Sequence, residues 1–388
     1  MLNRINCTGC GACSLKCPTH AISMECDNEG FLYPEIDIGK CVNCGKCKEV
    51  CHLNLQYKND FTTKVYAAVN KNQDILRHSS SGVVFSAIAD FILKNDGICY
   101  GVAAEKLKIQ YLRVDNKQDL YKIMGSKYVQ AENSKVFELV EKDCKTGKKV
   151  LFVGTPCLVA GLKRFLKEEY KNLYTLDIVC HGTPSKIYFD KYIEYLKNKL
   201  KIEVMEFNFR DKSKYGISCI SSCKIKKNGK SKKIVLTNQL LNYYYFYMFA
   251  DSYRESCYKC KYTNLNRVSD ITLGDFWGIE KLNSKLDVEH GCSAIIINSS
   301  KGDFLLTNVL SNKCYLEKKS IDDLTLNSAL YRQVDRPFTR DTLYNELLEN
   351  DFEYLVNGRY KPSFVKYAKG IAKGLLPSFL QNIIRKYL

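Results

Sequence analysis

Two cysteine motifs of the form C-x2-C-x2-C-x3-C stand near the start of the chain. Residues 7–18 read CTGCGACSLKCP and residues 41–52 read CVNCGKCKEVCH. This spacing is typical of bacterial ferredoxins that hold two [4Fe–4S] clusters, in which the fourth cysteine of each motif ligates the other cluster. It therefore predicts a first cluster on Cys7, Cys10, Cys13 and Cys51, and a second cluster on Cys17, Cys41, Cys44 and Cys47. Zinc ribbons use two separated CxxC pairs instead.

Three further features of the sequence lie within or between these two motifs. Glycines follow Cys10 and Cys44, and we expect them to relieve crowding where the backbone wraps each cluster. The second motif ends in His52, where the first motif has Pro18. Cys26 lies between the motifs and is expected to be a small packing residue.

Another CxxC pair, Cys257 and Cys260, lies far behind the ferredoxin motifs. The loops GTPC (154–157) and CHGTPS (180–185) each follow an expected strand and open an expected helix. In α/β folds such loops form ligand sites, because helix N-termini favour negative charge. If the two strands are neighbours, Cys157, Cys180 and the CxxC pair supply four thiols for a third [4Fe–4S] cluster. Alternatively, these are ordinary buried cysteines beside a turn. The remaining cysteines are expected to be packing residues: Cys99, Cys144, Cys219, Cys223, Cys292 and Cys314.

Strands and helices are expected to alternate after residue 62. Apolar runs predict strands at 65–70, 97–104, 109–114, 149–154, 173–180, 270–278 and 292–299. Helical spacing of apolar residues predicts helices within 78–95 and at 136–144, 158–166 and 187–200. A basic hairpin is expected at 224–236, turning at Asn228–Gly229. The predicted fold is a small two-cluster ferredoxin domain fused to a larger mixed α/β domain, of α+β or α/β class.

Composition narrows the class of protein. The chain has 388 residues, 45% hydrophobic, with a formal charge of +17. It contains no run of about 18 apolar residues and starts without the apolar segment of a signal peptide, so a cytoplasmic location is expected. Clusters held by thiolates, with a bound nucleotide, would lower the charge to roughly +10. Nucleic acid is therefore not expected as a partner.

Five segments occur in a fixed order behind the ferredoxin motifs: SSSGVVFSAIADFIL, GSKYVQ, GTPCLVAGLKRFL, DIVCHGTPS and CYKCKYTNLNRVSDITLGDFWGIEK. With them the chain resembles the beta subunits of coenzyme F420 (deazaflavin) hydrogenases and dehydrogenases over roughly residues 1–310. The resemblance implies a flavin-binding α/β domain, FAD, iron–sulfur clusters and, in many members, hydride transfer between deazaflavin and the flavin. Many similar bacterial proteins belong to surface-polysaccharide gene sets, so a role in that metabolism is one expectation.

The resemblance also implies a flavin pocket lined by Ser79, Ser80, Ser81, Gly82, Gly125, Ser126, Lys127 and Tyr128. Small residues at a helix start let a pyrophosphate approach backbone N–H groups, although the serines would also suit an ordinary N-cap. Val83 stands where the family usually has a second glycine. Lys127 is expected to neutralise a reduced flavin or a phosphate.

Four residues are candidates for moving protons: His181, Lys127, Tyr128 and Asp275. His181 stands beside a candidate cluster ligand and could equally hydrogen-bond to that cluster. Phe276 and Trp277 are expected either to pack on the flavin or to form a core aromatic pair.

The predicted domains are the ferredoxin domain (1–58), two parts of the beta-subunit-like domain (62–150 and 151–325) and a helical tail (326–388). Residues 361–388 form a basic amphipathic segment, expected to lie on a membrane surface or to pack on the body. The predicted function is an iron–sulfur flavoprotein oxidoreductase that acts on an organic substrate or deazaflavin, with a redox protein or ferredoxin as partner. The alternative is an electron-relay subunit without its own substrate.

Overall fold

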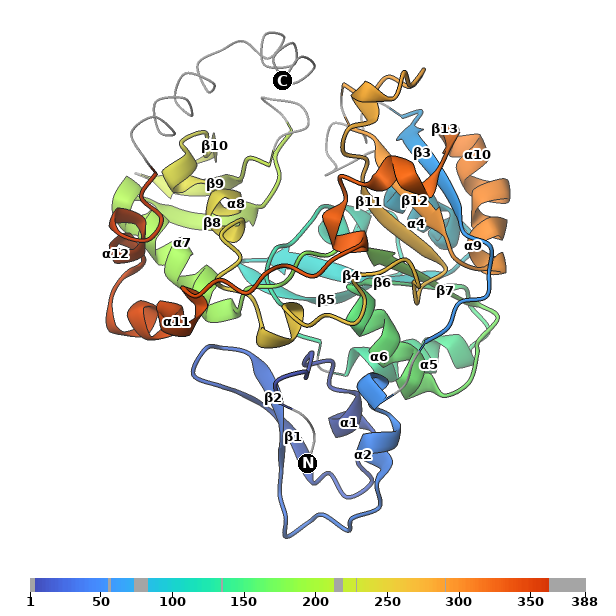
Figure 1. Ribbon diagram of the computed structural model, residues 1–388, viewed down its shortest axis with the longest axis horizontal. Helices are drawn as coiled ribbons and strands as arrows, with labels where there is room; N and C mark the ends of the chain where they lie inside the picture. The colour runs from blue at the N-terminus through green and yellow to red at the C-terminus, as the bar shows by residue number, and fades with distance from the viewer. Residues whose placement is uncertain are drawn as a thin grey trace.

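The computed structural model of the chain describes residues 4–54, 57–72, 83–133, 135–212, 219–227, 229–289 and 291–362. The N-terminal part is a small ferredoxin-like module that protrudes from one edge of the body (Figure 1). It contains one antiparallel strand pair and short helices: α1 (Ala12–Leu15), β1 (Ile22–Cys26), β2 (Leu32–Ile36) and α2 (Lys46–Glu49).

The body is built on an eight-stranded sheet with the order β13-β3-β12-β11-β7-β6-β4-β5. Strands β4, β6, β7 and β11 run parallel, and antiparallel strands complete both edges. The strands are β3 (Lys64–Asn70), β4 (Ile98–Glu105), β5 (Lys108–Val114), β6 (Val150–Gly154), β7 (Leu173–Ile178), β11 (Ile271–Asp275), β12 (Ser293–Ile297) and β13 (Cys314–Lys319). The mixed α/β prediction is confirmed.

Helices cover both faces of this sheet. Successive side chains of a strand point to opposite faces, so a buried strand contributes apolar residues to both. On β6, Val150 and Phe152 join the apolar cluster of α5 and α6, whereas Leu151 joins the cluster of α4 and α9 on the other face. These helices are α4 (Val84–Lys94), α5 (Val136–Lys145), α6 (Pro156–Leu166) and α9 (Ser300–Leu305), which α10 (Ser311–Lys313) follows. The predicted strands, and the predicted helices other than that at 187–200, have counterparts in this layered core.

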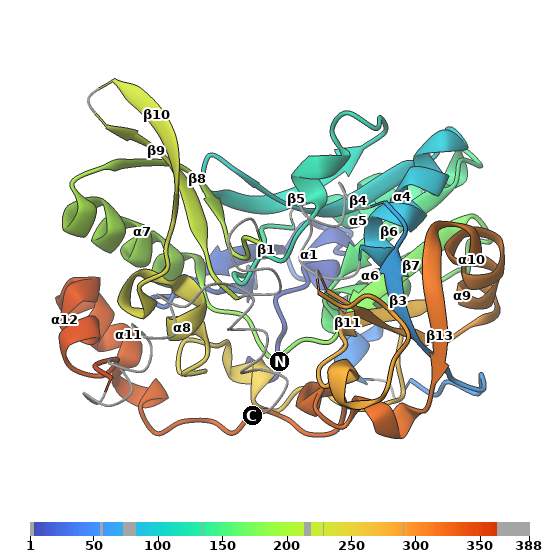
Figure 2. The same cartoon turned by 90° about the horizontal axis from the view of Figure 1, so that it is seen from above.

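A second lobe lies beside the large sheet (Figure 2). Among the described residues it contains the three-stranded sheet β10-β9-β8 and four α-helices around a core rich in tyrosine and phenylalanine. Its elements are α7 (Lys186–Leu200), β8 (Glu203–Asn208), β9 (Ser222–Lys227), β10 (Lys230–Val235), α8 (Tyr243–Tyr247), α11 (Arg340–Glu349) and α12 (Phe352–Asn357). Strands β9 and β10 pair antiparallel, which confirms the predicted basic hairpin.

Two predictions fall on residues outside the described part of the chain. They are the serine loop with Ser79, Ser80, Ser81 and Gly82, and the amphipathic tail from residue 363 onward. Within the described ranges, no helix has the length and apolar character needed to cross a membrane.

Candidate functional site

The site is built at the carboxyl ends of β6 and β7. These strands pair in parallel, with Gly154 opposite Asp177, so the GTPC and CHGTPS loops leave the sheet side by side. The first loop starts α6, which holds Cys157 in its first turn. The second loop leads to α7, where the Ser185 side chain accepts a hydrogen bond from the Tyr188 backbone N–H. The expectation that the two strands are neighbours is confirmed.

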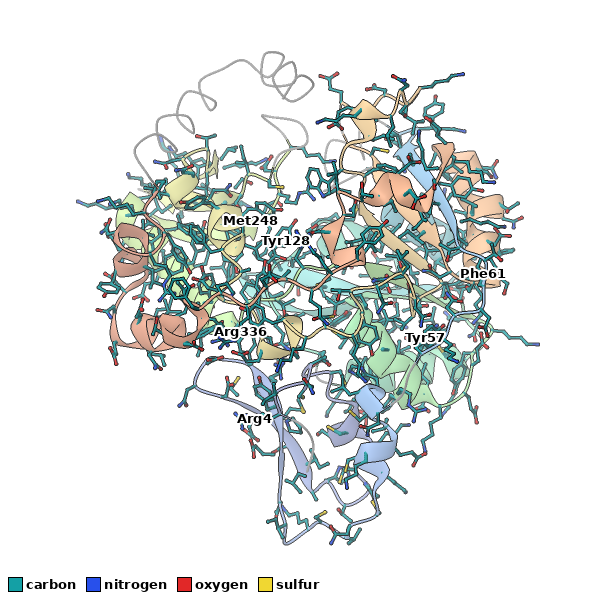
Figure 3. The ribbon with its side chains drawn as sticks, in the orientation of Figure 1. Arg4, Tyr57, Phe61, Tyr128, Met248 and Arg336 are labelled. Atoms are coloured by element: carbon teal, nitrogen blue, oxygen red, sulfur yellow. The ribbon has the colours of Figure 1, made fainter. Side chains whose placement is uncertain are left out.

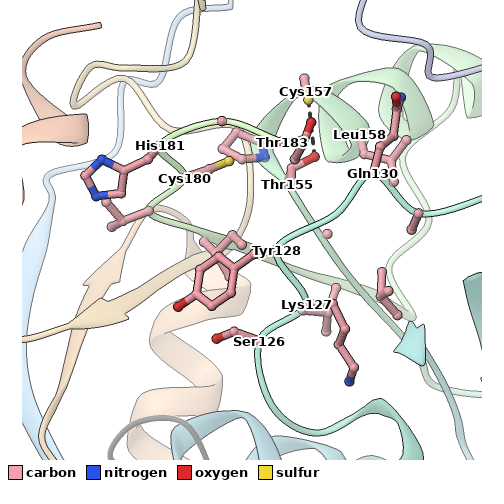
Figure 4. A pocket seen from close by; sticks show the side chains of 18 of the residues that line it. Ser126, Lys127, Tyr128, Gln130, Thr155, Cys157, Leu158, Cys180, His181 and Thr183 are labelled. Carbon is pink, nitrogen blue, oxygen red and sulfur yellow. Dashed lines mark hydrogen bonds between the residues drawn. The ribbon is translucent and has the colours of Figure 1, made fainter. Parts of the chain in front are cut away.

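Four cysteines line one pocket of about 720 Å³: Cys157, Cys180, Cys257 and Cys260. Figure 4 shows Cys157 and Cys180 on the same side of this pocket. Burial is the main cause that raises the pKa of Cys157 to about 12 and that of Cys180 well above its usual value, and the neighbouring thiols raise both further. Burial and Cys260 raise the pKa of Cys257 to about 11. The four thiols are therefore close enough to interact electrostatically.

Whether these four cysteines hold a cluster stays a prediction. Over the ranges that the structure describes, no three His, Cys, Asp or Glu side chains form a group that could hold one metal ion. A [4Fe–4S] cluster uses four cysteine thiolates. Burial raises the pKa values of these thiols, and two buried arginines act in the opposite direction. The positive charge of Arg254 lowers the pKa values of Cys157 and Cys257, and that of Arg267 lowers the pKa of Cys260.

The ferredoxin module gathers the four cysteines predicted for the first cluster. Burial is the larger cause of the raised pKa values of Cys10 and Cys13, and the thiols of Cys7 and Cys51 both raise them further. Cysteines from both motifs therefore meet at one place, as the cross-ligation prediction requires. The ligand assignment itself stays a prediction.

The cysteines predicted for the second cluster lie farther out. Cys44 is exposed, and Cys17, Cys41 and Cys47 are half-buried. The glycines after Cys10 and Cys44 both have left-handed backbones, with φ of 76° for Gly11 and 73° for Gly45. A Cβ on either would meet no protein atom within 4 Å, and the left-handed backbone itself favours glycine here.

Most of the other cysteines are buried, as expected, but two differ. Cys99, Cys144, Cys223, Cys292 and Cys314 are buried. Cys219 is half-buried, and Cys26, which was expected to pack, is exposed. The packing prediction is therefore wrong for Cys26.

The first cluster site lies directly against α6. A Cβ on Gly161 would come within 2.9 Å of the Cys10 Cβ and 3.0 Å of its Sγ. Because α6 also carries Cys157, one helix separates the first cluster site from the proposed third one. Glycine at this position permits the close approach.

A hydrogen-bond chain also connects these two sites. His52 Nε2 lies 3.0 Å from Thr8 Oγ1, and His52 Nδ1 lies 2.5 Å from Tyr262 Oη. Burial raises the pKa of Tyr262, and Cys157, Cys260, Cys10 and Cys51 add to this, so the phenol lies among both groups of thiols. The sequence shows His52 only as a departure from proline, and its partner is 210 residues away.

His52 makes stability depend on pH. Burial lowers its pKa from 6.5 to about 4, so the unfolded chain binds more protons between these values. Stability is therefore full above pH 6.5 and falls toward pH 4, by about 3 kcal/mol at most. His52→Gln, which does not titrate here, should lose this part of the pH dependence when the midpoints of guanidinium denaturation of both proteins are compared. Equal pH dependence in the two proteins would contradict the assignment.

The predicted flavin-binding segment lines the same pocket as the four cysteines. Gly125, Ser126, Lys127 and Tyr128 all contribute, and Gly125 has a left-handed φ of 80°. Figure 3 places Tyr128 near the middle of the molecule, between the two lobes. Its ring packs on Tyr247 with the ring centroids 4.7 Å apart, and burial raises its pKa to about 12. Tyr128 therefore remains a neutral hydrogen-bonding group.

Lys127 is placed differently from the expectation. Its ammonium group donates hydrogen bonds to the backbone carbonyls of Met124 at 2.7 Å and Lys122 at 3.3 Å. Figure 4 shows its side chain directed away from Cys157 and Cys180. Burial lowers its pKa to about 7. These contacts hold the preceding turn, whereas the sequence suggested contact with a flavin or a phosphate.

The other proton-transfer candidates also line the pocket. Burial lowers the pKa of His181, and Figure 4 shows its ring directed away from Tyr128. Asp275 is ion-paired with the buried Arg210, with 2.5 Å between the carboxylate oxygen and Nη1. No sequence pattern pointed to Arg210 as the partner of this carboxylate.

The two aromatic residues after Asp275 have different surroundings. Phe276 is buried in the core against β3 and β12, which is the core alternative. Trp277 is partly exposed and lines the pocket, which suits contact with a bound molecule.

Known proteins resemble separate parts of this chain. Residues 147–323 match the family that describes the C terminus of the coenzyme F420 hydrogenase/dehydrogenase beta subunit, and residues 6–54 match the 4Fe-4S dicluster domain. These matches agree with the resemblance found in the sequence. The third set of cysteines falls within the first of these ranges.

Individual relatives are more distant. The chain is 28% identical to the coenzyme F420-dependent sulfite reductase of Methanocaldococcus jannaschii over 49% of its own length and 29% of the relative's. It is 33% identical to DNA-directed RNA polymerase subunit Rpo3 of Methanosarcina acetivorans over 27% of its length and 34% of the relative's. The chain thus spans about a third of these curated relatives.

A solved structure of the F420-reducing [NiFe] hydrogenase complex from Methanosarcina barkeri contains a similar chain. The TM-score is 0.42 at 14% sequence identity, and the match covers 78% of this chain and 92% of that chain.

Proposed function

Because the chain joins a 4Fe-4S dicluster domain to the C-terminal domain of coenzyme F420 hydrogenase/dehydrogenase beta subunits, we propose that it is an iron–sulfur oxidoreductase. Electrons pass between the ferredoxin module and a third [4Fe–4S] cluster held by Cys157, Cys180, Cys257 and Cys260. They continue to FAD bound next to that cluster. An organic substrate, or deazaflavin itself, is reduced or oxidised there. A role in surface-polysaccharide metabolism stays a prediction.

One observation carries this proposal. The four clustered cysteines and the Gly125–Tyr128 segment line a single pocket, and the first cluster site lies against the helix that carries Cys157. The proposed electron donor and electron acceptor would thus lie next to each other in this pocket. The flavin of FAD supplies the conversion between single electrons and hydride, whereas deazaflavin exchanges hydride only.

The residues of the chain have separate tasks in this scheme. The ends of β6 and β7 position two thiols, and the CxxC loop brings two more. Arg254 and Arg267 offset the thiolate charge. Tyr128 and Trp277 supply aromatic surface on which a planar ring can lie. The Tyr128 hydroxyl remains protonated at neutral pH and can donate a hydrogen bond.

The test is a single-turnover experiment with anaerobically purified protein. The protein is loaded with FAD and mixed with dithionite-reduced ferredoxin in a stopped-flow spectrometer, first alone and then with deazaflavin as the hydride acceptor. The proposal expects cluster bleaching followed by reduction of the bound FAD. If the clusters are reduced and FAD does not bind, the relay-subunit alternative is correct.

Gly125→Ala tests the ring site separately. Because Gly125 has a left-handed backbone, alanine should lower the free energy of unfolding by about 1 kcal/mol and distort the segment that lines the pocket. Ring affinity, measured by equilibrium titration, should fall. Gly147→Ala is the matched control, because Gly147 has φ of 81° and open space around it, away from the pocket. Equal ring affinity in both variants would argue against this site.

A further inference from the structure

Arg210 is a buried cation that lines the pocket with part of its hydrogen-bonding capacity unused. It follows β8, and its side chain is only 3% exposed. Its Nη1 is ion-paired with Asp275, whereas Nε and Nη2 find no hydrogen-bond partner among the residues that the structure describes. None of the roles proposed above uses these two N–H groups.

Buried donors of this kind call for a partner. Leaving a charged donor buried without an acceptor is costly, so nearly all such groups in proteins are satisfied by protein, water or ligand. Nε and Nη2 form the side edge of the guanidinium, from which two N–H bonds point in parallel. This edge matches two oxygens on one atom, as in a carboxylate or a tetrahedral oxyanion.

Asp275 holds this edge in place. It binds the guanidinium through Nη1 and is itself only 15% exposed, so the side chain cannot turn easily. The backbone N–H of Arg210 donates to the Asn208 side chain at 3.1 Å, which fixes the start of the loop. The donors are therefore preorganised before any ligand binds.

The residues around Arg210 suit an organic molecule. Tyr128 and Tyr244 line the pocket and pack edge to face, with ring centroids 5.3 Å apart. Trp277 lines it as well. Aromatic walls bind an apolar body while the arginine binds an anionic end.

We propose that Arg210 is the anion-binding residue of this pocket, and that the substrate is an oxyanion, an organic carboxylate in particular, held by Nε and Nη2. The proposal rests on the proposed function in that the bound anion is the redox substrate. It narrows the substrate to molecules with two acceptor oxygens on one atom.

The only tryptophan of the chain, Trp277, provides the readout. The anaerobic holoprotein is labelled with 5-fluorotryptophan, and its single ¹⁹F resonance is followed during titration with benzoate, oxalate, sulfite and inorganic phosphate. Benzoate and oxalate test planar carboxylates, whereas sulfite and phosphate test the other oxyanions. We expect saturable shifts with at least one carboxylate.

Variants connect this binding to Arg210. Arg210→Met should weaken binding about tenfold or more, and Arg210→Lys should be intermediate because lysine lacks the fork. Arg332→Met, which changes an exposed arginine, should bind as the unchanged protein does. Iron content, measured in each sample, separates this question from the presence of the third cluster.

Three outcomes would overturn the proposal. The first is the absence of any saturable shift of the ¹⁹F resonance. The second is equal anion affinity in the Arg210→Met variant and the unchanged protein. The third is loss of FAD or deazaflavin binding in that variant while anion binding persists. The last would show that the arginine holds the ring.

Discussion

Replacing Cys257 and Cys260 together by alanine should remove about four irons from each chain and leave the ferredoxin clusters in place. Both cysteines line the pocket with Cys157 and Cys180, whereas the eight ferredoxin cysteines belong to a separate module. Reduction of a ring in the pocket should stop, because its neighbouring cluster is lost. Iron and sulfide analysis with EPR of the reduced protein measures this change.

A matched control replaces two other buried cysteines, Cys99 and Cys314, by alanine. Both belong to the apolar core of the large sheet and lie outside all cysteine motifs. This variant should keep its full iron content. If both double variants contain as much iron as the unchanged protein, the CxxC pair is structural and the third cluster does not exist.

Replacing Arg254 by alanine should weaken the contact between the ferredoxin module and the body. Its buried guanidinium donates to the backbone carbonyls of Cys7 at 2.6 Å and Leu32 at 2.8 Å, and lies 4.0 Å from the Tyr33 ring centroid. Hydrogen bonds to a charged group contribute about 1.5–3 kcal/mol each. The free energy of unfolding should therefore fall by about 3 kcal/mol or more, and electron transfer from the module to the body should slow at least tenfold.

Arg336→Ala provides the comparison for this variant. Arg336 forms two 2.9 Å hydrogen bonds to Glu255, but this pair is partly exposed. Its loss should cost less than about 1 kcal/mol. Denaturation measures the free energy of unfolding of both variants, and stopped-flow spectroscopy measures their rate of electron transfer from the module to the body. Equal effects in the two proteins would show that Arg254 does not hold the module in place.

The sequence predicts those parts of the site whose residues are close in the chain. Cysteine spacing identifies the ferredoxin module because a cubane needs several ligands from one tight loop. The strand-loop-helix pattern places Cys157 and Cys180 at neighbouring strand ends, which the parallel β6–β7 pair confirms.

Long-range contacts could not be predicted in this way. Arg210 meets Asp275 across 65 residues, and Arg254 reaches Cys7 across 247. Such pairs depend on how the lobes pack, which no local pattern encodes. The orientation of Lys127 toward backbone carbonyls also depends on a turn whose geometry the sequence leaves open.

Val83 shows a case in which sequence and conformation disagree. The family resemblance predicts glycine at this position, and Val83 adopts φ of 70° at the N-cap of α4. A β-branched residue rarely adopts this conformation, at a cost of about 1–3 kcal/mol. The Asn70 side chain donates a hydrogen bond to its carbonyl at 3.2 Å and helps to hold it there. Val83 also lines the pocket, so the strained backbone lies at the site itself.

The most direct test of the account is the iron, sulfide and ring cofactor content of the unchanged protein, purified without oxygen. Three [4Fe–4S] clusters predict about twelve irons and twelve sulfides per chain, with one FAD bound. About eight irons and no bound ring would contradict the account, because the pocket would then hold neither the third cluster nor the redox ring.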